Sequence, residues 1–181
     1  CLSLTAAAFV FAGGAFSAGA AWGGGAPVVE SLVPSASGTT TYGNEKAVID
    51  ASNASQGYVM VKYNGSGGKI KIQVAKSGGE TYTYDLNARD SYEVFPFSEG
   101  NGSYTVKVFE NVSGNQYMQA TGATVNVSLA NEFLPFLYPN QYVNFSDSNQ
   151  AVALAKSLAG SASDQLGIVR NVYDYVTDNI T

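Results

Sequence analysis

Few side chains in this sequence could carry out covalent chemistry. The 181 residues include no His and a single Cys, Cys1. A Ser-His-Asp set or a Cys-His pair therefore cannot be assembled within the chain, and neither a Cys-type zinc site nor an internal disulfide can form. We accordingly predict no catalytic residue, no metal ligand and no cofactor-binding residue here, and no cofactor.

Oxygen ligands offer one weak candidate for a cation site. Asp85, Asn87 and Asp90 follow one another at short spacing, but they supply too few ligands for calcium and lack the EF-hand spacing. Asp and Asn are also ordinary residues of turns between strands. The turn is the favoured interpretation and a calcium loop the alternative. No two of the fourteen acidic residues stand out as the paired carboxylates of a glycoside hydrolase.

A set of aromatic residues could form a platform on which sugars stack. The same residue types fill the cores of two-layered β proteins, and the core is the favoured interpretation. The set is Tyr82, Tyr84, Phe95, Phe97 and Phe109.

The charge balance excludes one class of partner. The formal net charge is −5, only 13% of residues are charged, and the nine cations are scattered. Binding to a phosphate backbone requires clustered Lys and Arg, so nucleic acid is not expected as a partner. An apolar content of 45% is enough for a substantial core.

The elements that would hold these side chains are mostly strands. In the range 102–110, Tyr104, Val106 and Val108 alternate with Thr105 and Lys107, which is the period of a strand with one buried face. Similar stretches recur about every ten residues, separated by Gly, Asn and Ser. We predict strands at 47–51, 57–63, 69–76, 81–86, 91–97, 103–109, 116–120 and 123–129, and a turn at Thr121-Gly122.

These strands predict a mainly β fold, an Ig-like or fibronectin-type antiparallel β-sandwich over residues 43–130. Gly102-Ser103-Tyr104 also resembles the Gly-x-Tyr strand of such domains. The expected core residues are Val59, Val61, Ile70, Ile72, Val74, Tyr104, Val106, Val108, Val125 and Val127.

The first residues are typical of an exported protein. No charge precedes Glu30, Leu2–Phe16 is apolar, and small residues come after it. We predict a partial signal peptide over 1–21, favoured over a membrane anchor, and a flexible linker over 22–42. The protein should then be secreted or at the cell surface, and off the membrane once the leader is removed.

The last residues change to a helical period. An apolar connector is expected over 131–147, packed against the part of the chain that comes after the sandwich. Two helices are expected within 148–181, with Asp164 in the first turn of the second. Their apolar faces are Ala151, Leu154, Ala155 and Leu158, then Leu166, Val169, Tyr173, Val176 and Ile180.

The segment 138–181, ending in IVRNVYDYVTDNIT, resembles the opening of a bacterial transglutaminase-like domain, whose architecture carries a papain-like Cys-His-Asp set. The residues that carry the resemblance are Ile168, Val169, Val172, Tyr173, Tyr175, Val176, Asn179, Ile180 and Thr181. In the family the catalytic residues lie beyond this helix, so no catalytic role transfers to any position here.

The resemblance implies a secreted thiol acyltransferase or peptidase that acts on protein or cell-wall peptide through a downstream domain. This fragment, truncated before the catalytic residues, would be inert and monomeric, with the sandwich as an accessory module. The alternative is a non-catalytic adhesion or carbohydrate-binding β-sandwich at the cell surface.

Overall fold

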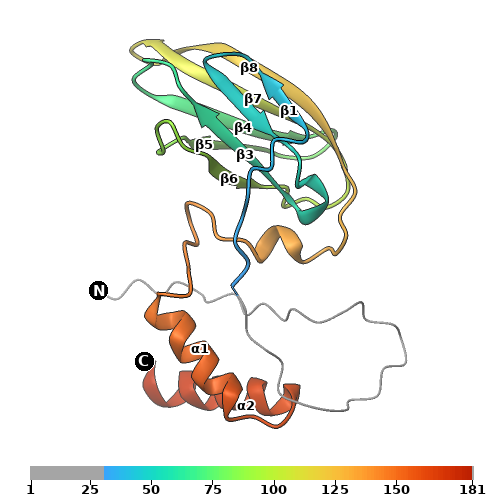
Figure 1. The fold of residues 1–181 in the computed structure, drawn as a ribbon, viewed down its shortest axis with the longest axis vertical. Helices are drawn as coiled ribbons and strands as arrows, with labels where there is room; N and C mark the ends of the chain where they lie inside the picture. Colours follow the sequence, from blue (N-terminus) through green and yellow to red (C-terminus); the bar gives the residue numbers. More distant parts are fainter. Residues whose placement is uncertain (1–30, 181) are drawn as a thin grey trace. The chain divides into compact units, whose positions relative to one another are not determined.

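The computed structural model describes residues 31–180. The expected signal peptide, the first part of the expected linker and Thr181 lie outside the described residues. The chain divides into two compact units (Figure 1). The β unit is Pro34–Tyr142, and among the described residues the helical unit contains 31–33 and 143–180.

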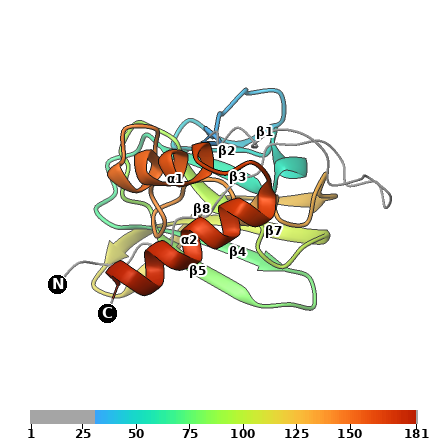
Figure 2. The same cartoon turned by 90° about the horizontal axis from the view of Figure 1, so that it is seen from below.

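The β unit consists of two four-stranded antiparallel sheets. Figure 2 separates them, with β2 and β3 in one layer and β4 and β5 in the other. The strands of the first sheet follow the order β1 (Thr41–Gly43), β2 (Ala47–Asp50), β3 (Tyr58–Tyr63) and β6 (Glu93–Pro96). The strands of the second sheet follow the order β5 (Thr81–Asp85), β4 (Ile70–Lys76), β7 (Gly102–Ser113) and β8 (Gln116–Val127). Two short 3-10 helices, η1 (Ala54–Gln56) and η2 (Leu134–Phe136), lie outside the sheets. The expectation of a mainly β chain with two C-terminal helices is confirmed.

One core is shared by the two sheets. Ile49 and Phe95 from the first sheet and Ile72 and Val106 from the second belong to the same buried cluster. Because successive side chains of a strand point to opposite faces, the alternating apolar residues all reach this layer. All ten core residues predicted from the alternation are buried.

The predicted break in the last strand is wrong. The turn expected at Thr121-Gly122 is absent, and β8 runs without interruption beside β7. Between the pairs Val108–Thr121 and Phe109–Gln119 the register shifts by one residue, which leaves Ala120 as the extra residue of a β-bulge. The continuous ladder of β7 supplies partners for the backbone here, so Gly122 pairs with Lys107 within the strand, two residues past the bulge, instead of forming a turn.

The segment just before β1 is held against the β unit, although the sequence pattern predicts a linker as far as residue 42. The backbone N–H of Gly38 donates to Oδ2 of Asp50 at 2.7 Å, and Nδ2 of Asn53 donates to the carbonyl of Ser35 at 2.7 Å. The buried carboxylate of Asp50 gains hydrogen bonds that a linker free in solution would not provide.

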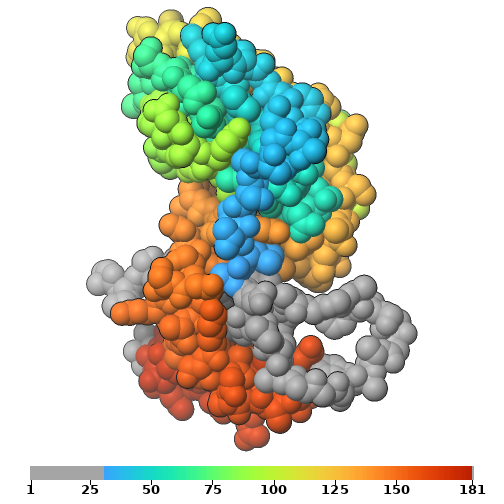
Figure 3. All heavy atoms as spheres, in the orientation of Figure 1, coloured from blue at the N-terminus to red at the C-terminus, as the bar shows by residue number. Residues whose placement is uncertain are grey.

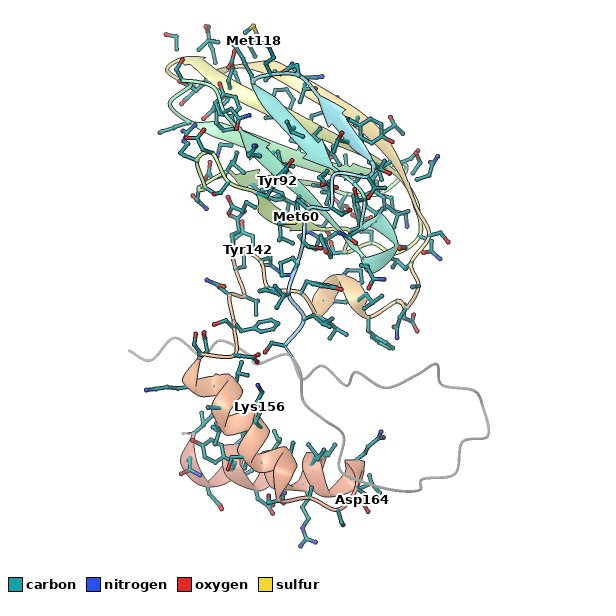
Figure 4. The ribbon with its side chains drawn as sticks, viewed as in Figure 1. Met60, Tyr92, Met118, Tyr142, Lys156 and Asp164 are labelled. Carbon is teal, nitrogen blue, oxygen red and sulfur yellow. The ribbon has the colours of Figure 1, made fainter. Side chains whose placement is uncertain are left out.

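The outer face of the first sheet carries a second apolar cluster. Tyr58, Met60 and Val94 are buried there, with Tyr92 and Tyr138 packed against them. Figure 4 labels Met60 and Tyr92 of this cluster. Tyr138 comes from the connector, and its ring centroid lies 4.5 Å from that of Tyr58. The apolar connector therefore packs on the sheet that precedes it, whereas the sequence pattern predicts packing against the later part of the chain. It does so because β3 is apolar on both faces.

The helical unit contains α1 (Gln150–Gly160) and α2 (Gln165–Asn179). Asp164 is the N-cap of α2, one residue before the helix, and its Oδ1 accepts from the Gly167 N–H at 2.7 Å (Figure 4). Asn171 Nδ2 donates to the Leu158 carbonyl at 2.9 Å and so links the two helices. The buried side chains of α1 are Val152, Ala155 and Ala159, so of the face expected for this helix only Ala155 is buried.

No helix within residues 31–180 is long and apolar enough to cross a membrane.

Candidate functional site

The residues of the alternative calcium loop, Asp85, Asn87 and Asp90, have other partners or lie in a turn. Asp85 ends β5, and its Oδ1 lies 2.6 Å from Lys71 Nζ, so an internal cation already balances it. The Asn87 backbone N–H donates to Glu93 Oε2 at 2.8 Å, and Asp90 has a φ of 55° in the loop. In the described part of the chain no three His, Cys, Asp or Glu side chains gather as metal ligands would. The geometry fits the turn interpretation.

The same Lys71–Asp85 pair lines a polar groove of about 590 Å³. The hydrogen bond to Asp85 raises the pKa of Lys71 above its ordinary value, so its ammonium stays charged near neutral pH. The other lining residues come from the start of β4 and the loop before it, from the loop after β5 and from the β7–β8 hairpin: Gly68, Lys69, Ile70, Leu86, Asn87, Arg89, Asn115 and Tyr117. The groove was not predicted, because its walls come from three segments far apart in the sequence.

Most of the aromatic set belongs to the core. Tyr84, Phe95 and Phe97 are buried, and the ring centroids of Tyr84 and Phe95 lie 5.3 Å apart. Burial raises the pKa of Tyr84 to about 12, so its hydroxyl stays neutral. Tyr82 is partly exposed on the edge strand β5, and Phe109 is half-buried opposite Lys71. The five side chains therefore do not form one sugar-stacking platform.

A buried carboxylate that the sequence did not single out joins three segments of the β unit. Tyr63 Oη donates to Glu110 Oε2 at 2.5 Å, and Lys46 Nζ donates to Glu110 Oε1 at 3.0 Å. Lys46 precedes β2, Tyr63 ends β3 and Glu110 lies in β7. The only sequence signal was Glu110 on the inward side of an otherwise apolar alternation.

The electrostatics of this cluster favour a structural role. Hydrogen bonds from Tyr63 and Lys46 lower the pKa of Glu110, and the same contact with Glu110 raises the pKa of Lys46. The amine is therefore protonated and the carboxylate ionised, so neither is set up for acyl transfer. Among the described residues no buried side-chain polar atom lacks a hydrogen-bond partner. The cluster has no unsatisfied group aimed at a ligand.

The cluster gives the β unit a predictable response to acid. Because the pKa of Glu110 is lower in the folded state, its contribution is complete above the ordinary value of 4.5 and is lost as pH falls through the folded value. We expect Glu110→Gln to reduce the free energy of unfolding at pH 7 by about 1 kcal/mol, the difference between a charged and a neutral acceptor. The variant should also lose less of its free energy of unfolding than the unchanged protein does as the pH falls below 4.5. Urea unfolding between pH 7 and pH 3 measures both effects.

The matched control is Glu132→Gln, at an exposed position after β8. It should leave unchanged both the free energy of unfolding at pH 7 and the slope of that free energy against pH below 4.5. An equal loss of slope in the two variants would show that Glu110 contributes no more to acid unfolding than a surface carboxylate.

The apolar stripe predicted on the second helix lies on the surface of α2. Side-chain exposure ranges from 42% to 67% along it, whereas Ile168, which lies beside the stripe on the helix, is buried. The stripe consists of four residues on α2 and its C-cap residue: Leu166, Val169, Tyr173, Val176 and Ile180. Exposed apolar faces that extend over several turns of a helix are commonly association surfaces.

No protein-family model, curated protein or solved structure matches the chain. The resemblance of the last helix to transglutaminase-like domains therefore rests on the residues quoted for it.

Proposed function

We propose that this chain is an Ig-like accessory module joined to the first helices of a secreted or cell-surface transglutaminase-like cysteine acyltransferase or peptidase. The exposed stripe of α2 is the observation that carries the proposal. Val169, Tyr173 and Val176 belong both to the stripe and to the resemblance. In the proposed enzyme, the remaining elements of the transglutaminase-like domain would cover this face of α2.

Two features support the Ig-like part of the proposal. The chain passes between the sheets after β3, β5 and β6, which places β7 beside β4, as in Greek-key sandwiches. Tyr104, near the start of β7, donates its hydroxyl to the Gly100 carbonyl at 2.8 Å. This backward hydrogen bond has the form of the tyrosine corner of Ig-like domains.

The residues present indicate which functions this chain would supply in such an enzyme. This chain has no His, and its only Cys lies in the apolar leader segment. The thiol, the base and its orienting acid would therefore come from other parts of the enzyme, and the β unit would position a protein or cell-wall peptide substrate. The chain alone is expected to be inert.

The complete reading frame gives the first test. It should encode Cys, His and Asp, in that order, after α2, and its product should incorporate a fluorescent primary amine into a glutamine-containing protein or cleave cell-wall peptides. Alkylation of the thiol should abolish the activity. A reading frame without this set, or one that continues with repeated β modules or a wall-sorting signal, would overturn the proposal and favour the adhesion alternative.

A pair of variants on α2 tests the proposed packing. Val169→Asp places a charge in the stripe, and Arg170→Gln changes the residue next to it. The side chain of Arg170 is 83% exposed, and its Nε lies 3.9 Å from Oδ2 of Asp174. In the complete protein Val169→Asp should accelerate hydrogen exchange throughout α2, whereas Arg170→Gln should have little effect. In the 181-residue chain neither variant should change the exchange of the strands. Equal exchange in both variants of the complete protein would show that the stripe is not covered.

A further inference from the structure

The polar groove of the β unit lies beneath an overhanging hairpin. Pairing between β4 and β7 ends at Ile70–Glu110, whereas β7 and β8 continue together to Ser113–Gln116. The hairpin therefore projects past the start of β4 and brings Asn115 and Tyr117 to the groove. Its tip lies at the end of the β unit, yellow in Figure 3, where Met118 is labelled in Figure 4. A volume of about 590 Å³ is within the range of sites for small ligands.

The charge of the groove is opposite to that of the chain. Lys69, Lys71 and Arg89 line it, and Asp85 is its one carboxylate. Within the described residues only Lys71 of these cations is ion-paired, so two positive charges remain available. A chain with a net charge of −5 thus presents a local surplus of cations in a concave site.

Arg89 is held in place before any ligand arrives. It donates through Nη2 to the Gly68 carbonyl, and its guanidinium carbon lies 5.7 Å from the centre of the Tyr63 ring. A guanidinium fixed in this way loses little side-chain entropy when an anion binds.

The remaining lining chemistry suits a polyol. The carboxamides of Asn87 and Asn115 both donate and accept hydrogen bonds, and Asp85 accepts them, as sugar hydroxyl groups require. The half-buried Tyr117 supplies an aromatic face and a hydroxyl group. A bare phosphate would leave the amides and the ring unused, and a polyphosphate would meet repulsion from Asp85.

We propose that this groove binds an acidic saccharide through its carboxylate, which Lys69 and Arg89 hold, while the ring stacks on Tyr117 and the hydroxyl groups contact Asn87 and Asn115. This function does not depend on the transglutaminase-like assignment. It gives the β unit a binding activity that would hold the protein on an anionic polysaccharide.

Calorimetric titration of the 181-residue chain tests the proposal. The probes are oligomers of galacturonate and of glucuronate, N-acetylmuramic acid and sialic acid, compared with a neutral galactose oligomer and with inorganic phosphate. We expect saturable binding of at least one carboxylated probe, at least tenfold tighter than the neutral oligomer and weaker at high salt. Lys69→Gln and Tyr117→Ala should each weaken it about tenfold.

The matched control is Lys62→Gln, which removes a cation whose Nζ lies over the Tyr92 ring and outside the groove lining. The affinity of the Lys62→Gln variant for the carboxylated probe should equal that of the unchanged protein. Arg89→Gln also loses the contact with Tyr63, so its thermal unfolding is measured alongside; the exposed Lys69 carries the test without that complication. The proposal is overturned if no carboxylated probe saturates, if phosphate or the neutral oligomer binds as tightly, or if Lys62→Gln weakens binding as much as Lys69→Gln.

Discussion

Phe97→Ala is expected to lower the free energy of unfolding of the β unit by about 3–5 kcal/mol, the usual cost of removing a buried phenyl ring. Phe97 is 0% exposed, and its ring centroid lies 4.7 Å from that of Tyr104. The truncation would leave a cavity between the sheets and remove one side of the packing around Tyr104. Because typical domains are stable by only about 5–15 kcal/mol, the variant should unfold at a much lower urea concentration.

Two further variants define the cause of that loss. Phe97→Leu retains most of the apolar volume and should cost roughly 1–1.5 kcal/mol. Phe133→Ala removes the same ring from a position that is 60% exposed, and should change the stability by no more than about 0.5 kcal/mol. Equal losses for Phe97→Ala and Phe133→Ala would mean that Phe97 is not a core residue.

The sequence was sufficient to predict ten residues of the core, because a single rule governs them. Val106 and Val108 in β7, Ile70 and Ile72 in β4, and Val125 in β8 all obey the two-residue period, and one face of each strand must be buried. The stripe of α2 was predicted in the same way from the 3.6-residue period. Its exposure shows that periodicity identifies an apolar face without identifying what covers it.

Features that depend on contacts between distant segments could not be predicted. The groove forms because β7 extends past the start of β4. Where the pairing of these two strands stops is set by contacts between distant segments and not by local propensity. The Tyr63–Glu110 hydrogen bond joins residues 47 positions apart. Local turn chemistry at Thr121-Gly122 was outweighed by the ladder of β7, because tertiary pairing overrides a weak local preference.

The second large effect is expected at Gly57, where the connector covers the first sheet. Gly57 has a φ of +87°, and a Cβ at this position would lie 2.6 Å from the backbone nitrogen and Cγ of Pro135. Alanine would therefore carry backbone strain and also displace the turn at η2. We expect Gly57→Ala to cost about 2–5 kcal/mol, the sum of roughly 1–2 for the left-handed conformation and roughly 1–3 for overpacking.

Gly78→Ala separates these two contributions. Gly78 has a φ of +75°, and nothing lies within 4 Å of the position that a Cβ would take. This variant should therefore lose only the strain contribution, roughly 1–2 kcal/mol. Hydrogen exchange gives the second measurement, because the N–H groups of Phe136 and Leu137 donate to carbonyls within the turn, at 3.0 Å each. Their exchange should accelerate in Gly57→Ala and stay unchanged in Gly78→Ala. Equal destabilisation by the two variants, with no change in exchange at η2, would show that the close approach of Pro135 to Gly57 does not hold the connector on the sheet.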